Sequence, residues 1–476
     1  MHSHSQVHEH TQLERRLTSA QISMIALSGA LGTGLFLGAG STIAHAGPAT
    51  IISYALAGCL ALSVVWALAE MVSAHPVPGG HGAIAATHLG KLGGYVTRWN
   101  FAITMLTAVG AEVTAAATYF QYWFPNLNLG LGTALCSLFI VTLNLATVRL
   151  YGSSEYWFSM IKVTAIVVFI ILGLAVVFTG WPSQNEPLGF VNLTVDGGFA
   201  PHGVTGILLA SCMAVFSFGG VENVSVSAAE SENPERDIPR AASTMIWRLL
   251  IFYIFAIAVI VALQPWTTTV AESGHADSSP FVKVLDSAGF AGAGHVMNAI
   301  LIVAALSAAN GCLYTGSRMI HSLALDGMAP RFAARTTDQG SPRGAVLLAT
   351  LCFFIASALA IFSPDTAFMS LYGAATVGIL VTWILVMLTH IKFRKHWDER
   401  GLPRPPARLL GAPVINVVVI AACIAIFIAL RNLLPVVWSA GIPYLAILMF
   451  SYFIVNAVRD LPEPAPLQIG SDSDSQ

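Results

Sequence analysis

The sequence predicts an all-α polytopic membrane protein, and its composition and the length of its apolar runs support this prediction. Of its 476 residues, 55% are hydrophobic and 10% are charged, and the mean hydropathy is +0.72. Soluble proteins average about 25% charged residues. The apolar runs are long and continuous, without the alternation of a membrane β-barrel. We therefore expect membrane lipid around the chain, and its net charge of −2 does not indicate nucleic-acid binding.

Twelve segments are long and apolar enough to cross a bilayer, which takes about 20 residues in a helix. We expect one transmembrane helix in each of residues 20–43, 48–74, 95–124, 129–149, 154–180, 203–229, 241–264, 293–316, 343–363, 367–391, 413–433 and 440–458. They make up a transporter domain over residues 20–460. The polar ends, residues 1–19 and 461–476, are expected to be disordered tails.

The basic residues predict the orientation of these helices. All 22 lysines and arginines except Lys283 and Arg431 lie in or beside the two tails and the connections on one side. Positively charged connections stay in the cytoplasm. Both termini are therefore expected to be cytoplasmic, in a multi-pass protein of the plasma membrane.

Two of the predicted spans contain glycine-rich interruptions. Residues 28–40 of the first span include five glycines, and residues 216–223 of the sixth include two adjacent glycines followed by an acid. Each glycine costs a helix about 1 kcal/mol relative to alanine. The two spans begin two five-helix halves, at about 20–180 and about 203–391, with two extra helices at about 413–458. Interruptions at matching positions are typical of inverted-repeat transporters.

The two breaks predict a site for the charged groups of an amino acid. The half-helix that starts near Thr33 offers free N–H groups, which suit a carboxylate. The half-helices that end near Ala30 and Phe216 offer free carbonyl groups, which suit an ammonium. The substrate's side chain would then lie over Gly219 and Gly220.

Two other interpretations of the glycines were considered. They can serve close helix packing alone, since Gly34 and Gly38 form a G-x-x-x-G motif. A dinucleotide-binding loop is excluded, because no strand precedes the glycines. The sequence also has no H-E-x-x-H, G-x-S-x-G or P-loop motif and no C-x-x-C pair, so we expect neither an enzyme nor a metal site nor a cofactor.

Ionisable residues within the predicted spans are functional candidates, because a buried charge costs about 2.5–3.5 kcal/mol or more. Glu70, near the end of its span, suits a structural role. Glu112 suits either a proton carrier or a hydrogen-bonding strut between helices. Glu222 directly follows the second break and is a candidate for proton coupling. Lys162 either acts from a buried position or extends to the cytoplasmic face.

Several long motifs resemble the amino acid–polyamine–organocation superfamily and, within it, the bacterial amino acid permeases. They are LERRLTSAQISMIALSGALGTGLFLGAG, LAEMVSAHPVPGG, GAEVTAAATYFQYW, YGSSEYWFSMIKV, FSFGGVENVSVSAAESENPERDIPRA and LSAANGCLYTGSRMIHSLALDGMAP. The resemblance covers roughly residues 13–400. It implies twelve transmembrane helices with a LeuT-type 5+5 inverted repeat, in which helices 1 and 6 are broken, and uptake coupled to protons.

The resemblance also implies roles for single residues. Gly32, Thr33 and Gly34 match the turn that binds the substrate carboxylate in the family. Ala30, Phe216 and Gly219 match the positions whose carbonyl groups bind the amine, and Phe216 also matches an aromatic gate. Glu222 and Glu112 match the family's acids in the sixth and third spans. Lys162 matches the family's lysine in the fifth span, whose ammonium group would take the place of the sodium ion in sodium-coupled relatives. One departure is Ala229, where relatives commonly have glycine.

The function predicted from the sequence is secondary active import of an amino acid, coupled to protons and proceeding by alternating access. An amino acid exchanger without proton coupling and a membrane amino acid sensor are the alternatives. The sixth-span lining, Ser217, Gly219 and Gly220, is small and neutral, which favours neutral substrates. Transport of cationic amino acids is not excluded, because Glu222 is available to bind them. The sequence does not predict an oligomeric state.

Overall fold

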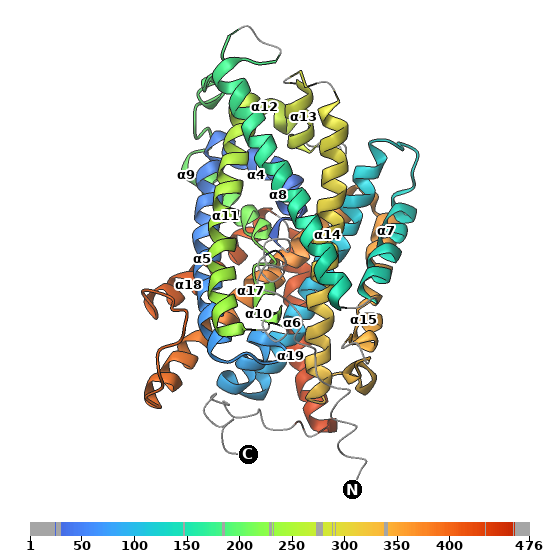
Figure 1. Cartoon of the computed structure of the whole chain (residues 1–476), viewed down its shortest axis with the longest axis vertical. Helices are drawn as coiled ribbons and strands as arrows, with labels where there is room; N and C mark the ends of the chain where they lie inside the picture. Colours follow the sequence, from blue (N-terminus) through green and yellow to red (C-terminus); the bar gives the residue numbers. More distant parts are fainter. Residues whose placement is uncertain are drawn as a thin grey trace.

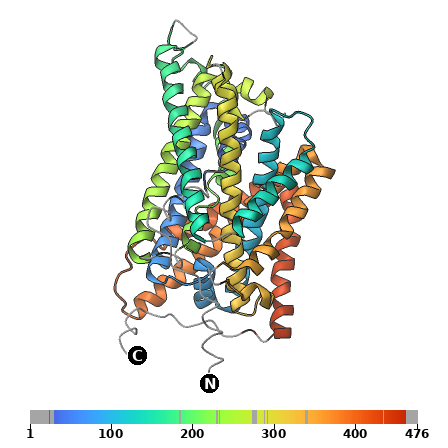
Figure 2. The same ribbon diagram turned by 45° about the vertical axis from the view of Figure 1, so that its right-hand side comes forward.

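The computed structural model is built of helices. It describes residues 24, 30–145, 148–182, 186–227, 231, 233–272, 279–287, 289–290, 292–337, 341–433, 435–459 and 461. In these residues, nine helical segments are long and apolar enough to cross a membrane. They run side by side as a bundle (Figure 1, Figure 2). The predicted all-α polytopic architecture is confirmed. The predicted tail 1–19, most of 20–29 and all but the first residue of the predicted tail 461–476 lie outside the described residues.

The helices follow the predicted spans from 48–74 onward. The first half of the chain contains α3 (Thr33–Phe36), α4 (Gly38–Ala46), η1 (Gly47–Ala49), α5 (Thr50–Ala74), α6 (Gly80–Gln121), α7 (Leu129–Asn144), α8 (Val148–Thr179), η2 (Val191–Leu193), α9 (Gly203–Ser217) and α10 (Asn223–Ser227). The second half contains α11 (Pro234–Leu263), α12 (Trp266–Glu272), α13 (Pro280–Ser287), α14 (Ala293–Leu325), η4 (Arg331–Ala334), α15 (Arg343–Ala349), α16 (Leu351–Phe362), α17 (Pro364–Glu399), α18 (Val414–Leu433) and α19 (Pro435–Arg459). Each predicted span after the first therefore corresponds to one helix or to two consecutive helices.

The helix α6 is longer than the sequence predicts. It begins at Gly80, well before residue 95, and bends at Gly90, whose φ of 79° is accessible to glycine at low cost. Its first part is held by tertiary contacts. The Nδ1 atom of His81 lies 2.7 Å from the Ser225 hydroxyl, and the His81 ring packs edge-on against Phe101. The contact with Ser225 joins residues 144 positions apart, so it cannot be recognised in the local sequence, which resembles a connection because of its glycines and histidines.

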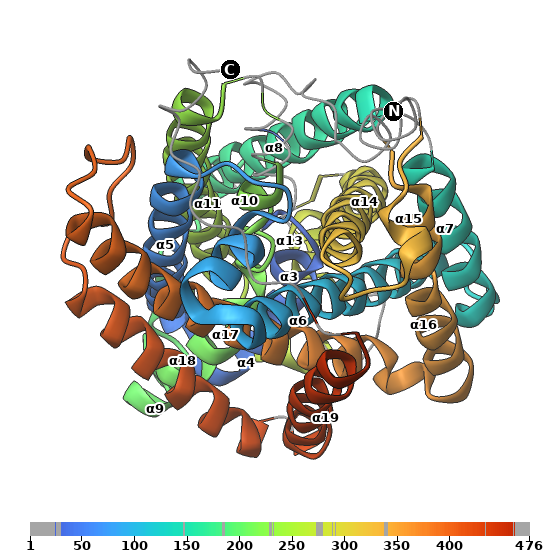
Figure 3. The same ribbon diagram turned by 90° about the horizontal axis from the view of Figure 1, so that it is seen from below.

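The helix α6 also forms the centre of the bundle, between α14 and α17 (Figure 3). Polar contacts fix its position along both neighbours. The Asn100 amide donates hydrogen bonds to the Gly378 carbonyl and the Thr382 hydroxyl of α17, both at 2.9 Å. The Arg98 guanidinium lies 2.6 Å from Asp326, which follows α14. A helix held in this way on two sides is a rigid support for residues that project from it.

A buried ion cluster connects the end of α5 to α17. Glu70 accepts hydrogen bonds from the Arg394 side chain at 2.8 Å, and its carboxylate lies 3.0 Å from His390 Nε2. The backbone N–H of Leu409 donates to the same carboxylate at 2.7 Å. Glu70 thus has the environment expected of a structural residue, because its charge is paired and its oxygens are hydrogen-bonded.

Candidate functional site

The first break lies where the glycines predict it. Leu31 and Gly32 are not helical, and Gly32 is extended, with φ −113° and ψ −163°. Helix resumes with α3 at Thr33. Leu37 keeps α-helical angles, and its N–H donates to the Thr33 carbonyl at 2.8 Å, so α3 and α4 form one helical segment over residues 33–46.

The second break separates α9, which ends at Ser217, from α10, which begins at Asn223. Residues 218–222 between them form turns. Gly220 has a φ of +96°, a conformation that strains any residue with a Cβ atom. The predicted interruption of the sixth span is therefore confirmed as a change of backbone conformation.

The two breaks touch each other. A Cβ atom added to Gly34 would lie 2.8 Å from the Ser217 Cα atom and 2.9 Å from the Phe216 ring. Tyr253 of α11 connects the same two segments, because its hydroxyl is 2.6 Å from the Ala30 carbonyl oxygen and 2.7 Å from that of Ser217. The sequence analysis missed Tyr253, since nothing in its local sequence distinguishes it from other aromatic residues of a span.

A small cavity of about 20 Å³ lies between the breaks. Its lining consists of Ala30, Gly32, Gly34, Met105, Ala108, Glu112, Phe216, Gly219, Gly220, Cys312 and Ile379. This volume holds about one water molecule. An amino acid therefore needs the surrounding helices to move apart before it can enter.

Most of the predicted binding residues lie at this cavity. Ala30, Gly32, Gly34, Phe216 and Gly219 belong to the lining described above. The other three predicted residues, Thr33, Ser217 and Glu222, belong to the chain segments of the two breaks but not to the cavity lining. The Phe216 ring packs on Tyr372 of α17, with ring centroids 3.9 Å apart, so an aromatic side chain does border the cavity.

Glu112 reaches from α6 to the first break. Its two carboxylate oxygens lie 3.1 and 3.3 Å from the Thr33 backbone nitrogen, which donates to them. A Cβ atom on Gly32 would lie 2.4 Å from one of these oxygens, so only glycine leaves room for this carboxylate. Glu112 therefore bonds to the N–H group that the sequence analysis assigned to the substrate's carboxylate.

Glu222 is bonded within the second break. Its carboxylate accepts a hydrogen bond from the Gly220 N–H at 2.9 Å and another from the Trp383 indole of α17. The side chain is fully buried. Trp383 was not predicted from the sequence, because the contact joins residues 161 positions apart.

Lys162 of α8 contacts the first break. It is fully buried, and its Nζ donates a hydrogen bond to the Leu31 carbonyl at 3.3 Å. Of the two positions considered for this side chain, the buried one is observed. The charges of Glu155 and Glu112 both act on its ammonium group.

Glu155 is a buried acid that the sequence analysis overlooked. It lies seven residues before Lys162 on α8, so the two side chains share a face of that helix. Its carboxylate accepts hydrogen bonds from the Ser307 hydroxyl at 2.9 Å and the Asn310 amide at 2.6 Å, both on α14. The Asn144 amide of α7 donates to Asn310 at 2.6 Å and extends this polar chain to a third helix. The spacing of seven residues between Glu155 and Lys162 is the feature of the sequence that could have identified Glu155.

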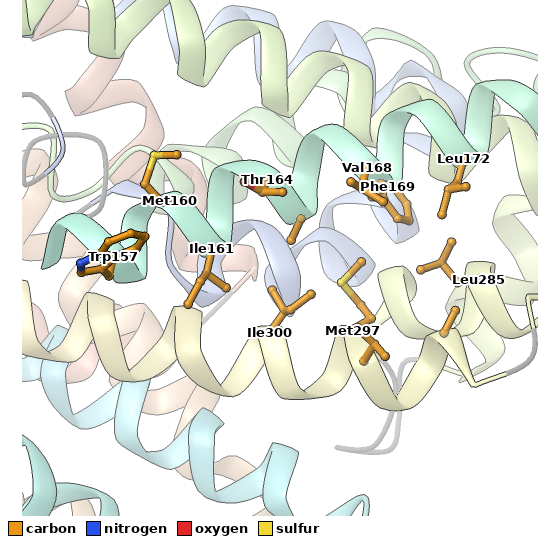
Figure 4. A pocket seen from close by; sticks show the side chains of 13 residues that line it. Trp157, Met160, Ile161, Thr164, Val168, Phe169, Leu172, Leu285, Met297 and Ile300 are labelled. Atoms are coloured by element: carbon orange, nitrogen blue, oxygen red, sulfur yellow. The ribbon is translucent and has the colours of Figure 1, made fainter. Parts of the chain in front are cut away.

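A much larger groove of about 620 Å³ lies between α8, α13 and α14 (Figure 4). Its lining consists of Trp157, Met160, Ile161, Thr164, Ala165, Val168, Phe169, Leu172, Leu285, Ala293, Val296, Met297 and Ile300. Thr164 supplies the single hydroxyl group in this set, and no side chain in it is charged. A zwitterion placed there would lose hydration without gaining partners. The groove is therefore unsuitable as the amino acid site despite its size.

Comparisons with known proteins identify the family of the chain. A family model described as amino acid permease matches residues 21–458. The chain is 38% identical over 399 residues to the aromatic amino acid transport protein AroP of Escherichia coli, a match that covers 84% of this chain and 86% of that protein. It is 34% identical over 418 residues to the gamma-aminobutyric acid permease of Bacillus subtilis, with 88% of each chain covered.

These relatives are named as transport proteins, in agreement with the prediction that the chain is not an enzyme. The match covers nearly the whole chain, and the described residues include many helices able to cross a membrane. The chain is therefore a multi-pass membrane protein that belongs to the amino acid permease family and functions in amino acid transport.

Proposed function

We propose that the protein imports a neutral amino acid together with a proton, by alternating access. One observation carries this proposal, namely the direct contact of two helix breaks around a small central cavity. The chain would have twelve transmembrane helices in two inverted five-helix halves, at about 20–180 and about 203–391. The first break belongs to one half and the second to the other, as such repeats require.

The cavity lining supports a substrate with an apolar side chain. Apart from Glu112, the lining side chains opposite the breaks come from Met105, Ala108, Cys312 and Ile379, and these four are uncharged. Glu222, which a cationic substrate would need, is hydrogen-bonded to Gly220 and Trp383. An aromatic side chain is the first choice, since a relative that is 38% identical is named for aromatic amino acids.

Proton coupling is assigned to three buried charged residues at the breaks, Glu112, Glu222 and Lys162. Their burial supports this assignment, because burying a charge at such depth costs free energy and buried charges in membrane spans therefore usually have a function. The proton is the coupling ion, and no other cofactor is proposed. The distribution of basic residues supports a plasma-membrane orientation with both termini in the cytoplasm.

The motion proposed for transport is a rocking of one group of helices against another. The first, second, sixth and seventh spans would move together as one group, which includes α4, α5, α9, α10 and α11. The Tyr253 hydroxyl supports this grouping, because it joins the seventh span to the carbonyl groups at both breaks. α6, between α14 and α17, supplies the support against which they move.

Uptake into proteoliposomes tests the proposal. The vesicles would be alkaline inside, and radiolabelled phenylalanine, tyrosine, tryptophan, leucine, γ-aminobutyrate, lysine and glutamate would be added singly. We expect accumulation of aromatic amino acids that collapses when a protonophore is added. Uptake that occurs only in vesicles preloaded with amino acid would identify an exchanger. Binding without uptake or counterflow would indicate a sensor and would refute transport.

A further inference from the structure

A carboxylate already occupies the first break. Both oxygens of Glu112 lie within 3.3 Å of the Thr33 nitrogen, and the side chain enters the central cavity from α6. The Thr33 N–H belongs to the continuous helical segment over residues 33–46, whose dipole favours a negative charge at this end. The observed bond shows that this N–H group can donate to a carboxylate.

Glu112 and the carboxylate of a bound amino acid cannot use this position together. The cavity has room for about one water molecule, and one Glu112 oxygen fills the space beside Gly32. Two carboxylates forced into one site repel each other strongly, so that one of them must take up a proton or leave. In the observed arrangement, the space beside Gly32 and Thr33 therefore holds a single carboxylate, which is that of Glu112.

We propose, on the basis of the proposed function, that Glu112 is a tethered competitor for the substrate's carboxylate. In the empty protein its ionised carboxylate holds the Thr33 N–H. A proton from the external solution converts it to the neutral acid, which releases Thr33 to the carboxylate of the incoming amino acid. When the substrate leaves toward the cytoplasm, Glu112 loses the same proton there and binds Thr33 again. One proton thus accompanies each amino acid.

The charges around Glu112 agree with such an exchange. Among the described residues, the titratable groups that interact with it are Lys162 of α8, Tyr119 of α6, Tyr253 of α11 and Cys312 of α14. Lys162 is the sole cation among them. When one carboxylate replaces another at Thr33, a negative charge remains near the buried Lys162 ammonium throughout the cycle. Loss of the Glu112 charge without a substrate would leave Lys162 less well compensated.

Substrate binding measured against pH tests the competition, with phenylalanine as the probe and the full-length protein in detergent. For the wild type, the apparent Kd is expected to rise about tenfold per pH unit above the range in which Glu112 ionises, because only the protonated fraction is competent. Glu112→Gln imitates the neutral acid, so its Kd is expected to be independent of pH. Glu399→Gln, the same exchange at an exposed position, serves as the matched control and is expected to keep the wild-type slope.

A second measurement uses the wild-type protein alone and does not depend on how the variant folds. Phenylalanine added to the protein in weakly buffered solution at alkaline pH is expected to cause uptake of one proton for each molecule bound. Binding without proton uptake, a Glu112→Gln variant that keeps the wild-type pH slope, or a folded variant that binds at no pH would each overturn the inference. Failure of the wild type to bind any amino acid of the transport panel would instead refute the proposed function, and this inference with it.

Discussion

An alanine at Gly34 would place one methyl group where α3 meets the end of α9. Its Cβ atom would lie 2.8 Å from the Ser217 Cα atom and 3.1 Å from the Ser217 nitrogen. Both are backbone atoms, which cannot turn away as the end of a flexible side chain does. Since ordinary contacts between such atoms begin near 3.4 Å, the two broken segments must separate by roughly 0.6 Å.

The expected cost follows from this overlap. Extra methyl groups in a packed interior typically cost about 1–3 kcal/mol. If the closed, substrate-bound conformation carries this strain, the affinity for substrate falls about 5-fold to 140-fold, since each 1.4 kcal/mol corresponds to a factor of ten. Gly441→Ala is the matched control, because its Cβ atom would make an ordinary contact, 3.4 Å from the Val377 side chain. We expect that variant to bind substrate within about twofold of the wild type, because its Cβ atom would overlap no backbone atom of another segment.

The assay is equilibrium binding of radiolabelled phenylalanine to purified protein in detergent, for Gly34→Ala, Gly441→Ala and the wild type. Thermal unfolding of the same samples shows whether each variant is folded. A folded Gly34→Ala protein that binds phenylalanine as tightly as the wild type would refute the reasoning. The two breaks would then not need to be in contact when substrate is bound.

Three further predictions concern buried polar groups. Tyr253→Phe removes the hydroxyl at both breaks and should destabilise the protein by about 1–3 kcal/mol. The loss should be smaller for Tyr54→Phe, because the Tyr54 hydroxyl makes a longer hydrogen bond of 3.3 Å. Melting temperatures of the two variants in detergent compare these effects. Glu155→Gln places an amide N–H₂ against one of the two donors from α14 and should lower the melting temperature, by about 1–3 kcal/mol in stability. Glu70→Ala leaves Arg394 without its carboxylate and should cost about 3–5 kcal/mol by chemical unfolding, whereas an unchanged midpoint would show that the buried cluster contributes no stability.

The helix breaks could be predicted from the sequence because their cause is local. Gly34 is explained by its close contact with Ser217 of another segment, whereas the positive φ of Gly220 and the extended conformation of Gly32 are properties of their own backbone. Such requirements leave a trace in a single sequence. The same holds for the long apolar runs, whose composition alone identifies them as helices able to span a membrane.

The partners of the functional side chains could not be predicted in this way. Tyr253, Trp383 and Glu155 act through contacts with residues from other helices, and these contacts depend on how the helices pack. The periodicity of a span shows which residues share a face, but an apolar helix has no single polar face that identifies its neighbours. For the same reason, the part of α6 before Gly90 resembles a connection in the sequence and is a packed helix in the structure.

The two acids at the breaks differ in how they reach them, and this difference separates their roles. Glu222 accepts from Gly220, two residues away in the same turn, so this bond moves with the sixth span. Its bond with Trp383 joins the turn to α17. Glu112 is on α6, 79 residues from Thr33, and any movement of α3 against α6 must stretch or break their contact. We therefore expect a proton on Glu112 to act on substrate binding, and a proton on Glu222 to act on the movement of the sixth span against α17.

These roles predict different defects in the two glutamine variants. Glu222→Gln is expected to keep the pH-dependent binding of the wild type and to lose accumulation of substrate against a gradient. Glu112→Gln is expected to lose the pH dependence of binding itself. Parallel measurements of binding and accumulation distinguish the two. If Glu222→Gln abolished the pH dependence of binding, the substrate's carboxylate would compete with Glu222 and not with Glu112, and the first break would lose its assigned role in coupling.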